Sequence, residues 1–275
     1  MNPHAQRSTS ISTLIKSVLA NKNLIYSLIR REVIGRYRGS IMGLLWSFFN
    51  PVLMLTVYTF VFSIVFKARW PGGTGSRTEF ALVLFSGLLI FNIFSECINR
   101  APSLILSNIN YVKKVVFPLE ILPIVALGSA GFHFLINLFV WLVFYMIFYG
   151  MPPTSISLIP LTLIPLIFMT LGLSWLLASL GVYLRDVGQI IGIITTVLMF
   201  LSTIFYPISA LPEQFQVYMH LNPLTFFIEQ TRDFMMWGKG VDWGVWSAWM
   251  LISSIITWCG FAWFQKTRKG FADVL

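Results

Sequence analysis

Four arginines gather in the stretch RREVIGRYRGS, at Arg30, Arg31, Arg36 and Arg38. Basic clusters beside a membrane attract anionic lipid head groups through their phosphates. The cluster runs without a break into a stretch free of charge, from Gly39 to Phe66. The arginines are therefore candidates either for phosphate binding or for a basic anchor that only fixes the orientation of the next segment.

Common catalytic and nucleotide-binding motifs are absent from the sequence, which has no GxxxxGK[ST], HExxH, CxxC or GxSxG. Cys97 and Cys259 lie far apart, so we expect free thiols and no metal site. His133 lies deep in a long apolar stretch, where a histidine is a candidate functional residue. Hydrogen bonding inside a helical bundle is the simpler interpretation, because the sequence gives His133 no partner. No apolar stretch carries a ladder of carboxylates, which argues against ion-coupled transport.

Two further groups of residues are candidates for a transport path. Within the expected helix 223–237, Glu229, Arg232 and Asp233 form either a local ion pair or a polar rim at the outer end of a path. Aromatic residues make up 16% of the chain, and rings at the ends of spans commonly form an interfacial belt. A stripe of rings could instead line a path for sugars. The candidates for it are Trp46, Phe49, Tyr58, Phe200, Phe205 and Tyr206.

The elements that position these residues are predicted to be membrane-spanning helices. The chain is 57% hydrophobic and 11% charged, with a mean hydropathy of +0.79. A soluble domain carries about 25% charged residues. The sequence therefore predicts an all-α integral membrane protein. The net charge is +9, and the basic residues lie between the apolar windows. This placement indicates that they determine the topology and do not bind nucleic acid.

Charge-free windows predict six spans near or above the roughly 20 residues that a helix needs to cross a bilayer, the second window being short and extended past Glu96. Together they form a transmembrane domain over 39–265, and their limits are about 39–66, 80–98, 119–149, 158–181, 187–206 and 243–265. The uncharged run from Ile121 to Leu184 is divided at the turn 150–153. Asn50 and Pro51 predict a kink or an unwound point in the first span.

The remaining segments lie outside the predicted spans. Residues 1–38 form an N-terminal segment with an amphipathic helix at 22–38, on which Glu32 and Arg36 are spaced to pair. Gly35, Gly39 and Gly43 either share one helix face or mark a joint before the first span. A loop with a helical middle covers 99–117, two short helices fall within 207–240, and a basic tail covers 266–275.

The distribution of lysine and arginine predicts the orientation of the chain. Six spans place both termini on one side, and that side holds 14 of the 19 basic residues. The other five are Lys67, Arg69, Arg77, Arg232 and Lys239. Positive residues stay in the cytoplasm, so both termini are predicted to be cytoplasmic. We expect no signal peptide in the first twenty residues.

Four stretches together resemble the membrane subunits of ABC-2-type exporters, specifically the polysaccharide-export permeases that move O-antigen, capsule or teichoic acid. They are RREVIGRYRGSIMGLLWSFFNPV, SNINYVKKVVFPLEILP, LGVYLRDV and YPISALPEQFQVYMHLNPLTFFIEQTRD. The resemblance covers nearly the whole chain and is greatest to O-antigen (lipopolysaccharide) permeases of Gram-negative bacteria.

The resemblance implies the ABC-2 exporter fold, with a homodimer in the bacterial inner membrane and two copies of a cytoplasmic ABC ATPase. ATP and magnesium would bind that ATPase, with no cofactor on this chain. The implied substrate is an undecaprenyl-pyrophosphate-linked polysaccharide. The four arginines, which include Arg36 and Arg38, would bind its pyrophosphate. The first and fifth spans would line the channel, and the helices within 207–240 would be re-entrant gate helices. The residues implied in ATPase coupling are Arg30, Arg31, Ser107, Asn108, Ile109, Asn110, Tyr111, Lys113 and Lys114.

Two other functions stay open on the sequence. One is an ABC-2 exporter of small lipids or drugs. The other is a membrane glycosyltransferase or acyltransferase, for which no persuasive carboxylate or histidine pair is found in a polar loop. Copurification of an ATPase would separate exporter from enzyme, and loss of surface polysaccharide on deletion would separate polymer from drug.

Overall fold

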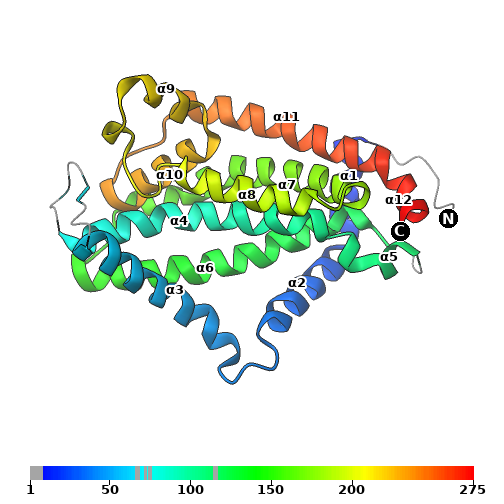
Figure 1. Cartoon of the computed structure of the whole chain (residues 1–275), viewed down its shortest axis with the longest axis horizontal. Helices are drawn as coiled ribbons and strands as arrows, with labels where there is room; N and C mark the ends of the chain where they lie inside the picture. The colour runs from blue at the N-terminus through cyan, green and yellow to red at the C-terminus, as the bar shows by residue number, and fades with distance from the viewer. Residues whose placement is uncertain (1–8, 66–68, 71–72, 74–75, 114–116) are drawn as a thin grey trace.

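The computed structural model describes residues 9–65, 69–70, 73, 76–113 and 117–275, and all the regular elements in these ranges are helices. Five helical segments are long and apolar enough to cross a membrane: Gly43–Phe62, Thr78–Ser103, Leu119–Tyr149, Thr154–Tyr183 and Trp243–Val274. Their long axes run in broadly the same direction, with α3 splayed away from the bundle (Figure 1). A multi-pass helical membrane protein is therefore confirmed.

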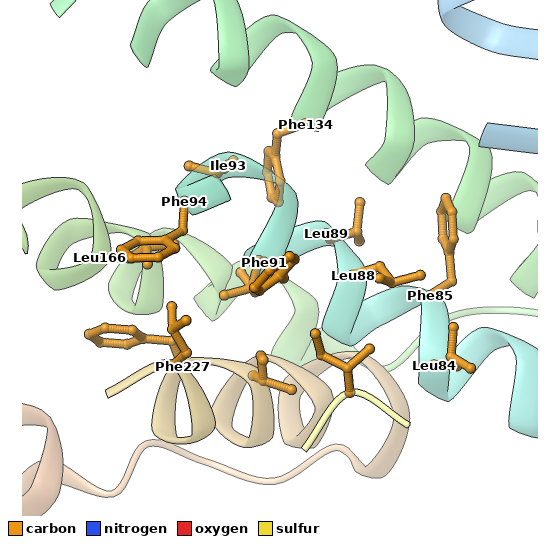
Figure 2. Close-up of a cluster of buried hydrophobic side chains, with 14 of the residues drawn as sticks. Leu84, Phe85, Leu88, Leu89, Phe91, Ile93, Phe94, Phe134, Leu166 and Phe227 are labelled. Atoms are coloured by element: carbon orange, nitrogen blue, oxygen red, sulfur yellow. The ribbon is translucent and has the colours of Figure 1, made fainter. Parts of the chain in front are cut away.

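Helix α4 (Arg77–Arg100) lies at the centre of the bundle, and most of its side chains are buried. It packs against α6 (Leu122–Tyr149), α7 (Ile159–Tyr183) and α10 (Pro223–Arg232). Figure 2 shows side chains leaving α4 toward these neighbours, which contribute Phe134, Leu166 and Phe227 respectively. Because the described side chains of α4 are buried except along the face that carries Asn92 and Asn99, it is a central helix and not a lipid-facing one.

Helices α7 and α11 (Trp243–Thr267) pack so closely that their backbones touch. A Cβ atom added at Gly172 would lie 2.5 Å from the carbonyl oxygen of Ile256, and one at Gly260 would collide with the carbonyl of Gly172. The Thr257 hydroxyl donates to the Phe168 carbonyl at 2.7 Å. Small residues that allow such close contact are a common basis of helix association in membranes.

The N-terminal segment forms two helices, α1 (Ile11–Ala20) and α2 (Lys22–Tyr37). The apolar side of α2 is not exposed: Ile25, Leu28 and Val33 are buried in the bundle. After α2 the chain turns sharply at Gly39, whose φ is +88°, before α3 (Trp46–Tyr58) begins. The three glycines therefore do not share one helix face, and a joint separates α2 from the first span.

Helix α3 runs through Pro51 without unwinding, so the predicted unwound point is wrong. The irregularity lies further along, in a π-helix at Thr59–Val65 (η2). Phe66, the last residue of the predicted span, is outside the described residues.

Helix α8 (Val187–Phe200) ends six residues before the predicted limit of the fifth span at Tyr206. Side chains take the carbonyls that would continue the helix. Asn222 donates to the carbonyl of Leu201 at 3.0 Å, and Arg232 donates to that of Thr203 at 2.9 Å. The two carbonyls lie just beyond the end of α8, where the side chains supply the donors that a continued helix would otherwise supply.

Two short helices, α9 (Glu213–Leu221) and α10, precede α11 as predicted. The Asn222 side chain caps α10 by accepting from the Leu224 amide at 3.0 Å, and Pro223 takes the first helical position. Gly238, with φ of +66°, ends the π-helical turn Asp233–Trp237 (η8) that continues α10.

The short helices gather at the two ends of the bundle (Figure 1). Helices α9 and α10 lie toward one end, and α1, α5 (Ile109–Lys113) and α12 (Phe271–Val274) lie at the other. Cys97 is buried and Cys259 is exposed, and both are free thiols.

Candidate substrate cavity and coupling surface

A polar cavity of about 430 Å³ lies between α2, α3, α4 and α6. Polar residues from each of the three spanning helices line it: Asn50 of α3, Asn92, Glu96 and Asn99 of α4, and His133 and Asn137 of α6. The α4 residues are four and three positions apart, so they share one helix face. Tyr37 at the end of α2 also lines the cavity, and partial burial raises the pKa of its hydroxyl. Figure 1 shows α2 and α3 diverging from the joint between them, with α6 behind.

An ion-pair network fixes α2 to this cavity. Arg36 Nη1 lies 2.6 Å from Glu96 Oε1, and His133 Nδ1 lies 3.0 Å from Glu96 Oε2. Arg100 Nη2 lies 2.8 Å from Glu32 Oε2. Two arginines and two glutamates thus join α2 to α4, with formal charges that cancel, and His133 connects α6 to them through Glu96.

The predicted pair between Glu32 and Arg36 on α2 is wrong, because both side chains turn to α4 instead. An exposed pair four residues apart on one helix contributes only about 0.2–0.5 kcal/mol. The carboxylate of Glu96 is only 18% exposed and accepts from two helices at once. His133 is hydrogen-bonded within the bundle, and Glu96 is the partner that the sequence did not reveal.

The four arginines of the sequence motif do not form one cluster. Arg36 lines the cavity, whereas Arg31 Nη1 donates to the Tyr111 hydroxyl at 3.0 Å. Arg30 and Arg38 are exposed, and their side chains make no ion pair or hydrogen bond with the part of the chain that the structure describes. The last two side chains are the ones available for an external anion.

The loop expected over 99–117 begins later, since α4 continues to Arg100, and its middle is helical. Ser107 and Asn108 lie in the 3₁₀ turn Leu106–Asn108 (η4), and Ile109, Asn110, Tyr111 and Lys113 lie in α5. Ser107, Ile109 and Asn110 are exposed. Lys113 donates to the backbone carbonyl of Leu275, and Lys114 lies outside the described residues.

The α5 turn is joined to α2 through aromatic and hydrogen-bond contacts. The Tyr111 ring stacks on Phe117 at a centroid distance of 4.2 Å, and its hydroxyl accepts from Arg31. The two segments expected to act in ATPase coupling, 22–38 and 102–114, therefore meet in the folded chain.

A buried ion pair is connected through Phe117 to the contact between α2 and α5. Glu120, which is 3% exposed, pairs with Arg268, and Arg268 also donates to the carbonyl of Phe117 at 2.6 Å. Ser17 of α1 donates to Glu120 at 2.8 Å, and Trp175 of α7 donates to its backbone carbonyl at 2.9 Å. One carboxylate thus ties both ends of the chain to the segment that follows α5.

The predicted aromatic residues fall into two groups. Tyr58, Phe200 and Phe205 form a chain of rings with Phe62, in which Phe62 and Phe205 stack at 5.3 Å and Phe200 and Phe205 at 5.5 Å. The Tyr206 hydroxyl donates to the carbonyl of Phe200 at 2.6 Å, which places it in the same group. Trp46 and Phe49 lie apart, exposed at the start of α3. Phe62 contacts Tyr58 of α3 and Phe205 in the segment after α8. It was not among the candidates predicted from the sequence for a transport path.

Of the two interpretations of Glu229, Arg232 and Asp233, the local ion pair is confirmed between Glu229 and Arg232, and Arg232 is not part of a polar rim because it is 1% exposed. Its guanidinium donates to Glu229 at 2.9 Å and to the backbone carbonyls of Val83 and Thr203, and it lies 4.3 Å above the Trp70 ring. Asp233 pairs instead with Lys239 at 2.9 Å. The apolar sequence around Val83 gave no indication that a carbonyl of α4 would accept a hydrogen bond from an arginine.

Comparisons with known proteins agree with this architecture. The model of the ABC-2 type transporter family matches residues 23–236. The O-antigen export system permease protein RfbA of Myxococcus xanthus is 27% identical over 262 residues, which cover 94% of this chain and 98% of the relative. The protein of the same name from Klebsiella pneumoniae is 28% identical over 255 residues, or 92% of this chain and 95% of the relative.

A more distant relative, the polysialic acid transport protein KpsM of Escherichia coli, is 25% identical over 220 residues, or 79% of this chain and 83% of the relative. These matches support a transport subunit and not an enzyme, as the motifs in the sequence predict. The family match spans most of the chain and all of the cavity. The chain belongs to the ABC-2 type transporter family.

Proposed function

We propose that this chain is the membrane permease subunit of an ATP-driven exporter of lipid-linked polysaccharide, with O-antigen as the polymer. The observation that carries the proposal is similarity over nearly the full length to O-antigen export permeases. A polar cavity among otherwise apolar spanning helices supports it, because a membrane protein has little reason to keep such a cavity except for a polar substrate.

The pyrophosphate of an undecaprenyl carrier would bind at the exposed arginines beside the cavity. Arg30 and Arg38 carry charges that no described acidic residue offsets. Arg36 would contribute less than the sequence suggested, because Glu96 already pairs with it. The lipid tail would stay in the bilayer while the polymer passes through the protein.

The path for the polymer would run between two copies of the chain, along α3 and α8. Both helices carry large exposed side chains in the single chain, among them Leu53, Val57, Ile193 and Val197. A homodimer that pairs these helices would enclose the ring chain of Tyr58, Phe62, Phe200 and Phe205. Helix α8 would then count as the sixth crossing, although at about 1.5 Å per residue its 14 residues are short for a bilayer.

ATP hydrolysis would take place on two copies of a separate ABC ATPase, which bind the nucleotide and magnesium. The ATPases would dock at the surface formed by α2, η4 and α5, whose exposed residues include Ser107, Ile109 and Asn110. Closure of the ATPases would move α2, and the Arg36–Glu96 pair would transmit that motion to α4.

The chain would lie in the bacterial inner membrane with both termini in the cytoplasm. The excess of basic residues at that end supports this orientation, as does the grouping of α1, α5 and α12 at one end of the bundle (Figure 1). Helices α9 and α10 would then be re-entrant at the outer side.

The proposal is tested by deleting the gene in its host and examining the surface polysaccharide. We expect loss of surface O-antigen and accumulation of lipid-linked polymer in the inner membrane, both restored by the intact gene. Loss of a capsule or teichoic acid with normal O-antigen would assign another polymer. Normal surface polysaccharide would contradict the proposal and favour an exporter of small lipids or drugs.

A further inference from the structure

Three asparagines from three different spanning helices face the cavity. They are Asn50 of α3, Asn92 of α4 and Asn137 of α6. Within the described part of the chain, none of these side-chain amides makes a hydrogen bond. Asn99, by contrast, accepts from the Thr195 hydroxyl of α8 at 2.9 Å. Three amides thus offer donors and acceptors to whatever occupies the cavity.

Placing these amides in apolar helices is unfavourable unless they find a partner. Scattered amides would each bond to a neighbouring helix, as Asn99 does. These three instead converge on one space, so a shared polar occupant explains their positions better than separate structural roles do.

The charges around the cavity select the kind of occupant. Arg36 pairs with Glu96 of the lining, and Arg100 pairs with Glu32, which lies outside the lining, so neither arginine contributes an unpaired positive charge to the cavity. An anion site would need such a charge. Amides that both donate and accept, with a carboxylate and the Tyr37 ring beside them, suit an uncharged ligand rich in hydroxyl groups. A volume of about 430 Å³ lies within the range of small-ligand sites.

We infer that this cavity is a carbohydrate subsite, which holds the sugar next to the lipid pyrophosphate. The inference rests on the proposed function. Tyr37 lines the cavity, and the exposed Arg38 follows it directly in the chain. A pyrophosphate at Arg38 would therefore place the first sugar at the opening of the cavity.

The test measures binding of two probes to the full chain, co-expressed with its ATPase and held in lipid nanodiscs. The probes are undecaprenyl pyrophosphate and undecaprenyl-pyrophosphoryl-N-acetylglucosamine. The variants are Asn92→Leu, Asn137→Leu and the double substitution, which remove the amides at nearly constant volume in apolar helices. Ser247→Leu, at an exposed position of α11, introduces the same side chain away from the cavity.

We expect the wild type and Ser247→Leu to bind the sugar-bearing lipid more tightly than the bare pyrophosphate. Each asparagine substitution should reduce that preference about fivefold, the effect of one hydrogen bond, and leave affinity for the bare lipid unchanged. Equal binding of both probes by the wild type, or a preference that survives in the double variant, would overturn the inference and leave the proposed function intact. Binding of neither probe would contradict the proposed function itself.

Discussion

Replacing Arg232 with alanine tests whether one buried guanidinium holds together the end of the bundle at which α9 and α10 lie. Its donors reach the carbonyl of Val83 on α4 at 3.2 Å and that of Thr203, after α8, at 2.9 Å. It also pairs with Glu229 of α10 and lies over the Trp70 ring. No alanine side chain can replace any of these contacts.

The expected loss follows from what the truncation leaves behind. Removing one partner of a buried ion pair typically destabilises a protein by about 3–5 kcal/mol, because the remaining polar groups stay buried without partners. The carbonyl of Thr203 would lose its arginine donor in this way, whereas that of Val83 still accepts from the Ser86 hydroxyl at 2.7 Å. For a chain of this size, about 2–4 °C of melting temperature corresponds to 1 kcal/mol, so we expect a decrease of roughly 6–20 °C.

The assay is thermal unfolding of the purified chain in detergent, at one scan rate because membrane proteins unfold irreversibly. Lys239→Ala is the matched control: it breaks the neighbouring pair with Asp233, in which the lysine is 60% exposed. Such a pair contributes at most about 1 kcal/mol. Arg232→Lys keeps the positive charge but lacks the several donors of the planar guanidinium. Its melting temperature should fall between those of Arg232→Ala and Lys239→Ala. If Arg232→Ala melts within the range of Lys239→Ala, the reasoning is refuted.

Three further substitutions test other contacts. Gly260→Ala should lower the melting temperature by several degrees, because its Cβ would strike the α7 backbone, whereas Gly131→Ala, with open space around it, should not. Glu96→Gln should loosen α2 from the bundle, so a cysteine placed at the buried position Val33 should react faster with maleimide; an unchanged rate would contradict the ion-pair account. Tyr111→Ala should reduce export more than ATP hydrolysis in the assembled transporter, and equal losses would argue against a role in coupling.

The sequence predicted the long helices well, because absence of charge is itself the signal. The third span, expected over 119–149, coincides with the apolar segment Leu119–Tyr149. The end of α8 was not predictable in this way. The carbonyls of Leu201 and Thr203 just after it accept from Asn222 and Arg232, which lie 21 and 29 residues further along the sequence.

The cavity was not predictable from any one window. Glu96 interrupts the end of the predicted span 80–98 and had no predicted partner, and His133 had none either. Their contact joins residues 37 positions apart and depends on how α4 packs against α6. The spacing of Asn92, Glu96 and Asn99 on one face of α4 was the signal that could have pointed to it.

Movement of the polymer itself tests the central claim most directly. Inverted inner-membrane vesicles that contain this chain and its ATPase would be given lipid-linked polysaccharide, ATP and magnesium, and then an endoglycosidase. The account predicts that polymer becomes protected from the enzyme only when ATP can be hydrolysed. Polymer that stays fully digestible, although a stoichiometric and active ATPase complex is present, would contradict it.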